Sequence, residues 1–278
     1  MAADMPQPTP PPQADFALPD GWTVVAIAVL VYFLGTVIHE ALGHGLAALL
    51  VGLHPARVTS VDLDVSFRGV ALGKMRFVAA AGCIANGVAA VVAMAGWRRS
   101  RDASGATRFF WWLLATINLL IPGGYLMVGS PIGFGDWGQF ELGLSPLWAW
   151  KLGLTILGLA ISLLGLWWGA RHLGAFLPAG PARRTATWRL VLGSYLAGGI
   201  ASAAAGAMNP ISPVLIATSA AAASFGGTAW LLWIGGIAVR QRAGGSQRRE
   251  ILASGQWRIA GLVALVIYIG VLGPGLPR

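Results

Sequence analysis

The chain has 278 residues, of which 56% are hydrophobic and only 10% are charged, and its net charge is +9. This composition excludes an ordinary soluble domain, in which about a quarter of the residues are charged, and is typical of a protein with several membrane spans. The positive charge does not indicate a nucleic-acid partner, because the arginines lie mostly in short loops and at the ends of apolar runs. We therefore expect a multi-pass protein of the lipid bilayer, in a bacterial inner membrane, that binds no nucleic acid.

Residues 1–21 precede the first apolar run and form a Pro-rich segment with three aspartates. A secretory signal peptide begins with basic residues and continues into an apolar stretch. This segment lacks that order, so we expect a disordered tail, followed by a first span that is retained.

Seven apolar stretches follow, each long enough for the roughly 20 residues with which an α-helix crosses the hydrocarbon core. They are 22–51, 77–96, 109–129, 146–170, 188–206, 211–239 and 257–273. The predicted fold is therefore all-α and polytopic, with about seven transmembrane helices. Partial alternation of polar and apolar residues within 57–68 predicts a short β-hairpin between the first two spans.

The first span carries His39-Glu40-Ala41-Leu42-Gly43-His44 in its carboxyl-terminal half. Ionisable side chains are costly at membrane depth, so a functional site is expected there. In an H-E-x-x-H helix, two histidines four residues apart bind one zinc ion and the glutamate acts on water. Here the spacing is five, which on a regular α-helix turns the two rings about 140° apart. Both can bind one metal only if the turn is widened, as in a π-bulge, and Gly43 tolerates such a distortion.

The same spacing resembles the H-E-x-x-G-H motif of the dipeptidyl peptidase III family, in which the inserted residue still permits zinc binding. That resemblance covers six residues and implies no shared fold. The alternative interpretation is that His39 and His44 are interior residues that pair with each other, with Glu40 or with backbone carbonyls.

A third metal ligand has to come from another part of the chain, where acidic residues are few. His44 lies near the carboxyl end of the first span, and the third span runs in the same direction, so segment 130–137 emerges on the same side. Asp136 is therefore the best candidate, whereas Asp102 and Glu250 fall on the opposite side. Further candidates on the correct side are His54, Asp62, Asp64 and Glu141.

The order of these features resembles the site-2 protease family of intramembrane zinc metalloproteases over residues 22–140. After the histidine-bearing helix and the hairpin, residues 81–86 (Ala-Gly-Cys-Ile-Ala-Asn) are similar to the family's Gly-Pro-x-x-Asn. Residues 118–122 (Asn-Leu-Leu-Ile-Pro) and 135–137 (Gly-Asp-Trp) resemble its Asn-x-x-Pro followed by Asp-Gly. The departures are the five-residue histidine spacing, Cys83 in place of proline, one additional residue before Pro122, and an aspartate that lies further on and precedes tryptophan.

The resemblance implies a three-helix metalloprotease-like core at 22–140. The apolar stretches that follow predict an additional four-helix transmembrane region at 141–278, which lies outside the resemblance and has no assigned role. It implies Zn2+ held by His39, His44 and Asp136. Asn118, or alternatively Asn86, would then donate a hydrogen bond to the oxyanion, although helix-to-helix hydrogen bonds are an equally good interpretation of both.

The activity that the resemblance implies is hydrolysis of a peptide bond in or near a transmembrane helix. Glu40 would act as the general base on a metal-activated water. The partner would be a transmembrane or membrane-associated protein substrate. The alternatives are a metal-binding transporter or sensor without proteolysis, and a pseudoprotease.

Arginines concentrate between the second and third, the fourth and fifth, and the sixth and seventh spans. The positive-inside rule places these loops and the amino terminus in the cytoplasm, and hence the Asp136 side outside. Members of the site-2 protease family usually place their zinc toward the cytoplasmic face, so the two indications disagree on the face to which the site opens.

Overall fold

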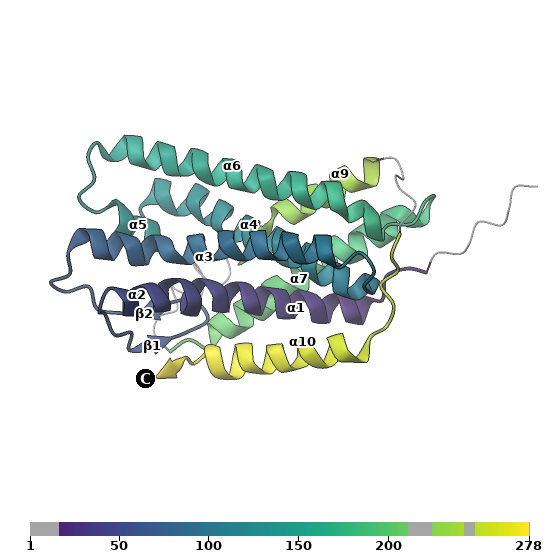
Figure 1. The fold of residues 1–278 in the computed structure, drawn as a ribbon, viewed down its shortest axis with the longest axis horizontal. Coiled ribbons are helices and arrows are strands. Elements are labelled where there is room, and N and C mark those ends of the chain that lie inside the picture. The colour runs from purple at the N-terminus through teal and green to yellow at the C-terminus, as the bar shows by residue number, and fades with distance from the viewer. Residues whose placement is uncertain (1–16, 211–223, 242–247, 278) are drawn as a thin grey trace, which may run out of the picture.

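The computed structural model describes residues 17–210, 224–241 and 248–277. Within them the chain is a bundle of long apolar helices with one small antiparallel sheet (Figure 1). Six helical segments of this part are long and apolar enough to cross a membrane. They are Gly21–Leu50, Leu72–Arg99, Gly105–Ile132, Leu147–Phe176, Ala182–Ala207 and Gly255–Leu272. The prediction of an all-α polytopic membrane protein is confirmed.

The spans divide into labelled elements that are used below. The first consists of α1 (Gly21–Val37), a π-helical segment (Ile38–Gly45) and α2 (Leu46–Leu50). The next are α3 (Leu72–Arg99), α4 (Gly105–Ile132), α6 (Leu147–Leu173) with a 3-10 turn to Phe176, and α7 (Ala182–Ala207). The last is α10 (Gly255–Ile267), continued by a π turn (Tyr268–Leu272).

The predicted span 211–239 is described only from residue 224 onward, where α9 (Trp230–Arg240) forms its final part. Residues 211–223 of that span lie outside the described part of the chain, as do residues 1–16 of the predicted tail.

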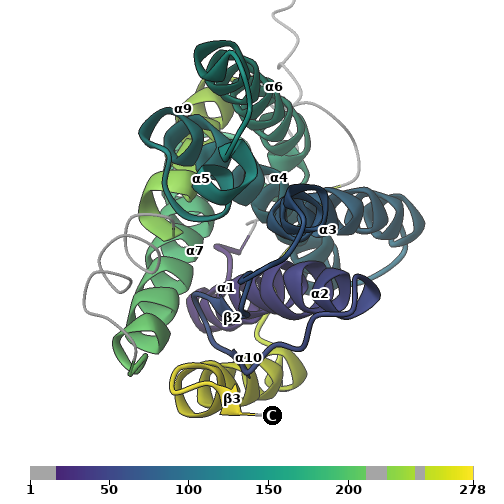
Figure 2. The same cartoon turned by 90° about the vertical axis from the view of Figure 1, so that its left-hand side faces the viewer.

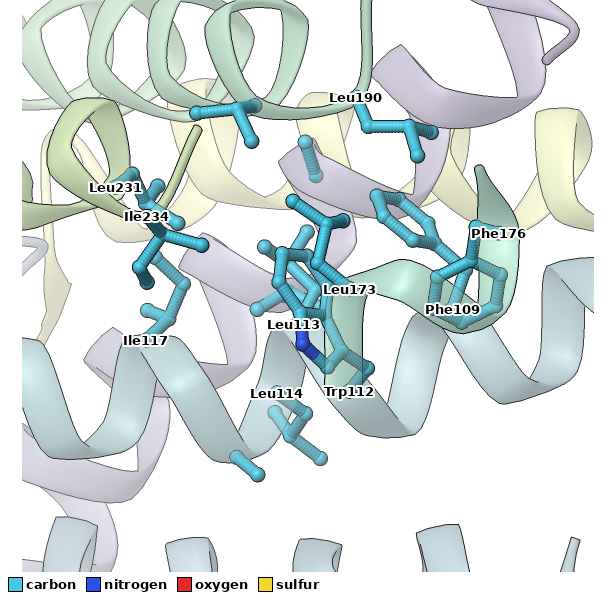
Figure 3. Packing of buried hydrophobic residues seen from close by; sticks show 14 of the residues in the cluster. Phe109, Trp112, Leu113, Leu114, Ile117, Leu173, Phe176, Leu190, Leu231 and Ile234 are labelled. Atoms are coloured by element: carbon cyan, nitrogen blue, oxygen red, sulfur yellow. The ribbon is translucent and has the colours of Figure 1, made fainter. Parts of the chain in front are cut away.

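Helix α4 is the central element, since most of its length is buried and it packs against α1, α3 and α6 (Figure 2). Figure 3 shows Phe109, Trp112 and Ile117 of α4 meeting side chains of α6, α7 and α9. Helices α7 and α10 pack along α1. The helices that follow residue 141 therefore share one apolar core with the first three spans.

Small residues allow α6 to lie close to α4. Helix association in lipid depends on close packing, because lipid tails are as apolar as the helices themselves. A Cβ at Gly158 would come within 2.7 Å of the Gly123 carbonyl oxygen, and a Cβ at Gly165 within 2.8 Å of a Leu120 methyl group. Larger side chains at these positions would push the two helices apart.

The predicted hairpin is confirmed as β1 (Arg57–Val58) and β2 (Leu63–Asp64), which pair antiparallel. The sequence did not predict β3 (Leu276–Pro277), which pairs with the other edge of β1 and gives the strand order β2-β1-β3. The turn between β1 and β2 is fixed to the bundle, because the Ser60 N–H donates to the Leu272 carbonyl at 2.8 Å.

The two ends of the bundle differ in chemistry. One end carries the sheet, the π-helical segment and the short helix α5 (Gly135–Glu141), which had not been predicted. The opposite end carries the carboxyl ends of α3, α6 and α9, where most of the arginines lie. This separation agrees with the loop assignment made from the arginine distribution.

Candidate metal centre

His39, Glu40 and His44 lie on the π-helical segment between α1 and α2. The Leu46 N–H bonds to the carbonyl of Ala41, five residues earlier, as a π-helix requires. This wider turn brings both imidazoles to one side, with ring centroids 4.8 Å apart. The prediction that the five-residue spacing needs a π-bulge is confirmed.

Two glycines bring α3 into backbone contact with this segment. A Cβ at Gly43 would lie 2.6 Å from the Gly82 Cα. A Cβ at Gly82 would lie 2.5 Å from His44 Nε2 and 2.6 Å from His39 Nε2. A side chain at position 82 would therefore enter the space between the two rings, and only glycine leaves that space open.

Hydrogen bonds fix the tautomer of both histidines. His44 Nδ1 lies 2.7 Å from the Val78 carbonyl oxygen, which can only accept, so this nitrogen carries the proton. His39 Nδ1 lies 2.7 Å from Asn86 Oδ1. The Asn86 amide nitrogen donates to Gly35 O and to Asn118 Oδ1, so its oxygen faces His39 as an acceptor. In the neutral rings both Nε2 atoms then carry a lone pair.

Asp136 is brought to these lone pairs by α5. Its backbone N–H donates to the Tyr125 hydroxyl at 3.0 Å. The preceding Gly135 has a φ of 61° and lies against the same hydroxyl, a position with no room for a side chain. The far end of α5 is tied down by Glu141, whose carboxylate accepts from Ser130 at 2.5 Å. These contacts aim the Asp136 carboxylate at the histidines.

The three side chains form a group that can hold a metal ion. Their ligand atoms all lie within 4.8 Å of one another. Asp136 Oδ2 is 3.1 Å from His44 Nε2 and 3.6 Å from His39 Nε2. Ligands about 2.1 Å from a tetrahedral zinc ion are about 3.4 Å apart, which is close to the two distances from Asp136 to the histidines.

The charges around the cluster keep Asp136 ionised. Burial alone would raise the pKa of Asp136, but the facing imidazoles of His44 and His39 outweigh it and hold the pKa below its ordinary value. Asp62 behaves in the opposite way, because burial and then the neighbouring charges of Asp136 and Asp64 raise its pKa. Asp136 is therefore the better metal ligand of these carboxylates.

Glu40 lines a cavity of about 160 Å³ together with His39 and Asp136. Its carboxylate makes no hydrogen bond to any of the described residues. The other walls are formed by helices α1, α4 and α5, by the hairpin turn, and by parts of the chain after residue 141. The wall residues from these later parts are Ser202, Ser224 and Tyr268. The additional transmembrane region thus contributes one wall of the cavity beside the cluster.

Asn118 lies behind Asn86 and does not line the cavity. Its oxygen accepts from Asn86 at 2.8 Å, and its amide nitrogen donates to the Leu114 carbonyl at 2.9 Å. Asn86 in turn contacts His39. The structure thus places both asparagines in a chain of hydrogen bonds that orients His39, which favours the helix-to-helix interpretation over contact with an oxyanion.

The alternative third ligands do not join the metal group within the described residues. Glu141 is engaged with Ser130 and lies 3.9 Å from the Lys151 ammonium. Asp62 lines the cavity without reaching the cluster. His54 and Asp64 are exposed. Of the five candidates on this side, the structure brings only Asp136 to the histidines.

Sequence analysis missed the tyrosines of the site. The chain has four tyrosines, and three of them, Tyr32, Tyr125 and Tyr268, line the cavity. The Tyr268 hydroxyl bonds to Thr36 at 2.7 Å and to Ser202 at 3.0 Å, which joins α1, α7 and the final span. Tyr125 lies between Pro122 and Asp136 in the sequence. Its hydroxyl group within an apolar span could have indicated that it belongs to the site.

Comparison with models of known protein families, with curated proteins and with solved structures finds no match to this chain. What the protein does is therefore inferred from the site itself.

Proposed function

We propose that the protein is a zinc-dependent intramembrane peptidase of a bacterial inner membrane. It hydrolyses peptide bonds in or near transmembrane helices of other membrane proteins. The observation that carries this proposal is the convergence of two imidazole nitrogens and the Asp136 carboxylate in a cavity among membrane spans. The Glu40 carboxylate lines the same cavity and bonds to none of the described residues. The resemblance of residues 22–140 to the site-2 protease family supports the same conclusion.

The donor set favours zinc. Two imidazoles and one carboxylate are a common ligand set of catalytic zinc sites, which leave the fourth position open. Both Nδ1–H groups donate to protein oxygens, the arrangement that usually orients metal-binding histidines. When bound, zinc supplies Lewis acidity to a water molecule and to the scissile carbonyl.

Glu40 serves as the general base. It follows His39 directly on the π-helical segment and lines the same cavity, so its carboxylate is available to a water molecule beside the ligands. It accepts the proton of the attacking water and passes it to the leaving amine. A site that only transports or senses a metal has no need of an additional unbonded carboxylate, which favours hydrolysis over that alternative.

Tyr125 is the group best placed to donate a hydrogen bond to the oxyanion. Its hydroxyl oxygen already accepts from the Asp136 N–H, so its own proton is left to donate. That proton has no acceptor among the described residues. The ring lines the cavity, with its centroid 6.1 Å from that of His39. A fixed donor at this position stabilises the negative charge that develops on the carbonyl oxygen.

The substrate has to enter as an extended strand, because a helix hides its peptide bonds in its own hydrogen bonds. One edge of β1 is taken by β2 and the other by β3, and no strand of the described residues pairs with the outer edge of β2. Asp62, which directly precedes β2, lines the cavity. A substrate strand that pairs with β2 is therefore led toward Glu40.

The test compares the membrane proteins of a bacterial host that expresses the wild-type chain or Glu40→Gln. Mass spectrometry of new protein termini should find cleavage within or beside transmembrane helices in the wild type and none in Glu40→Gln, while both proteins purify with the same metal content. His54→Ala, an exposed histidine outside the metal group, is the control and should cleave normally. Cleavage that persists in Glu40→Gln would rule out this base.

A further inference from the structure

A second cavity lies at the arginine-rich end of the bundle. It has a volume of about 390 Å³ and is enclosed by the carboxyl ends of α3 and α6 and the beginning of α4. Its polar and aromatic lining consists of Trp97, Arg98, Arg101, Arg108, Arg171 and His172, with two further tryptophans of α6 beside them. On α4, Arg108 and Tyr125 are 17 residues apart, about 25 Å at the rise of an α-helix, so this cavity is separate from the metal centre.

Arg108 is the unusual residue of this cavity, because it is a buried charge without a counter-ion in the described part of the chain. Its side chain is only 7% exposed. It makes no hydrogen bond or ion pair to the described residues, and its Nε is buried without a partner. The guanidinium lies 4.2 Å from the centroid of the Trp97 ring, which offsets only part of the cost of removing it from water.

No acidic side chain within the described ranges compensates this charge. Arg101 and Arg249 add positive potential at Arg108, and the opposing carboxylate among the described residues is the exposed Asp102. Asp4 and Asp15, in the amino-terminal tail, are the only acidic residues of the sequence that lie outside the described part. A cavity lined by arginines around a buried guanidinium that no described residue pairs with is suited to an anion with several acceptor oxygens, such as a phosphate group.

The surroundings of the cavity favour a phosphate that belongs to a lipid. Leu164 and Trp167 line it and are 46% and 57% exposed on the outer face of α6, and Val91 on α3 is 66% exposed. These apolar side chains can lie along acyl chains, while tryptophan is typical of the membrane interface. The arginine distribution places this end in the cytoplasmic leaflet, where anionic lipids attract basic residues.

We propose that this cavity binds the headgroup of an anionic phospholipid, with Arg108 at its base and Arg98, Arg101 and Arg171 around the phosphate. The bound lipid joins the ends of α3, α4 and α6 and neutralises the buried guanidinium. The site does not depend on the proposed peptidase activity.

The test uses the purified, delipidated protein in neutral detergent and native mass spectrometry with added phosphatidylglycerol, phosphatidylcholine or inorganic phosphate. We expect one tightly bound phosphatidylglycerol per chain, a raised melting temperature, and neither effect with phosphatidylcholine or phosphate. Removing one of these arginines should lower the affinity for phosphatidylglycerol about fivefold. The double variant Arg98→Gln/Arg171→Gln should therefore bind this lipid about 25-fold more weakly. Arg99→Gln removes the same charge from the same helix end outside the cavity and should bind normally.

Arg108→Gln should also bind phosphatidylglycerol weakly. If this variant fails to fold, the affinity of the Arg98→Gln/Arg171→Gln variant decides the test, because both of its arginines are exposed. Equal affinity for the two lipids, or unchanged affinity in the double variant, would overturn the proposal. Stabilisation by phosphate alone at the same concentration would overturn the lipid as the occupant.

Discussion

At the scale of single residues, the candidate metal centre depends on the atoms that orient His39, His44 and Asp136 as much as on these three residues themselves. His44 and His39 each donate from Nδ1 to a protein oxygen, so each presents Nε2 toward Asp136. The candidate residues that the structure brings together could be predicted from the sequence, because a His-Glu pair and a second histidine are costly in an apolar span unless they bind something there. The roles of Val78 and Asn86 could not, since a backbone carbonyl and a common helix-packing amide carry no distinctive signal.

Substitutions of Asn86 and Asn118 test whether the two asparagines orient His39 or contact the oxyanion. Asn86→Ala removes the acceptor of His39 Nδ1–H, and the loss of such a partner typically weakens metal binding by about 10- to 100-fold. Asn118→Ala should weaken it less, because Asn118 acts through Asn86. Competition with a zinc chelator measures both. Unchanged metal affinity in Asn118→Ala together with lost cleavage would instead mean that Asn118 contacts the oxyanion.

Tyr125→Phe tests the proposed oxyanion donor. The variant keeps the ring but loses the hydroxyl that accepts from the Asp136 N–H, so its affinity for zinc should fall. At saturating zinc the single-turnover cleavage rate should still fall about 100- to 1,000-fold, the usual effect of removing one oxyanion donor. Tyr195→Phe is the matched control, because the Tyr195 hydroxyl bonds to the Phe225 carbonyl away from the cavity. A Tyr125→Phe enzyme with a normal rate would remove Tyr125 from the mechanism.

At the scale of elements, the π-helical segment is the feature that the sequence predicts best. Five residues between two ligands cannot be reconciled with a regular α-helix, so the spacing alone required the widened turn. Helix α5 was not predicted, because its seven residues include Gly135 and Gly138 and give no periodic apolar pattern. It is held instead by tertiary contacts, among them Arg76, which donates to the carbonyls of Phe140 and Leu142.

The contact between α3 and the π-helical segment leads to a prediction about two glycines of one helix. Gly82→Ala places a methyl group 2.5 Å from His44 Nε2 and should abolish zinc binding with the helix content unchanged. Gly87→Ala meets no atom within 4 Å and should keep its zinc. Circular dichroism and zinc analysis of the two variants check this. Full zinc occupancy in Gly82→Ala would mean that the space between the rings is not where the metal lies.

At the scale of the whole molecule, the bundle places the cavity with the candidate metal ligands at one end and an arginine-rich surface at the other. Six of the seven predicted spans agree with spans of the described residues, because long apolar runs are a strong signal, and the seventh, 211–239, is described only from residue 224 onward. The walls of the cavity could not be predicted, since the Tyr268 hydroxyl bonds to Thr36 across 232 residues of sequence and to Ser202 across 66, and periodicity carries no information on such contacts. The later helices are thus part of the site.

The zinc content of the purified protein tests the central claim most directly. The wild type should hold about one zinc ion per chain, and His39→Ala, His44→Ala and Asp136→Ala should each lose it, because each removes one of three ligand atoms. Glu40→Gln should keep it. A wild type without zinc, or an Asp136→Ala protein that retains it fully, would contradict the metal centre described here.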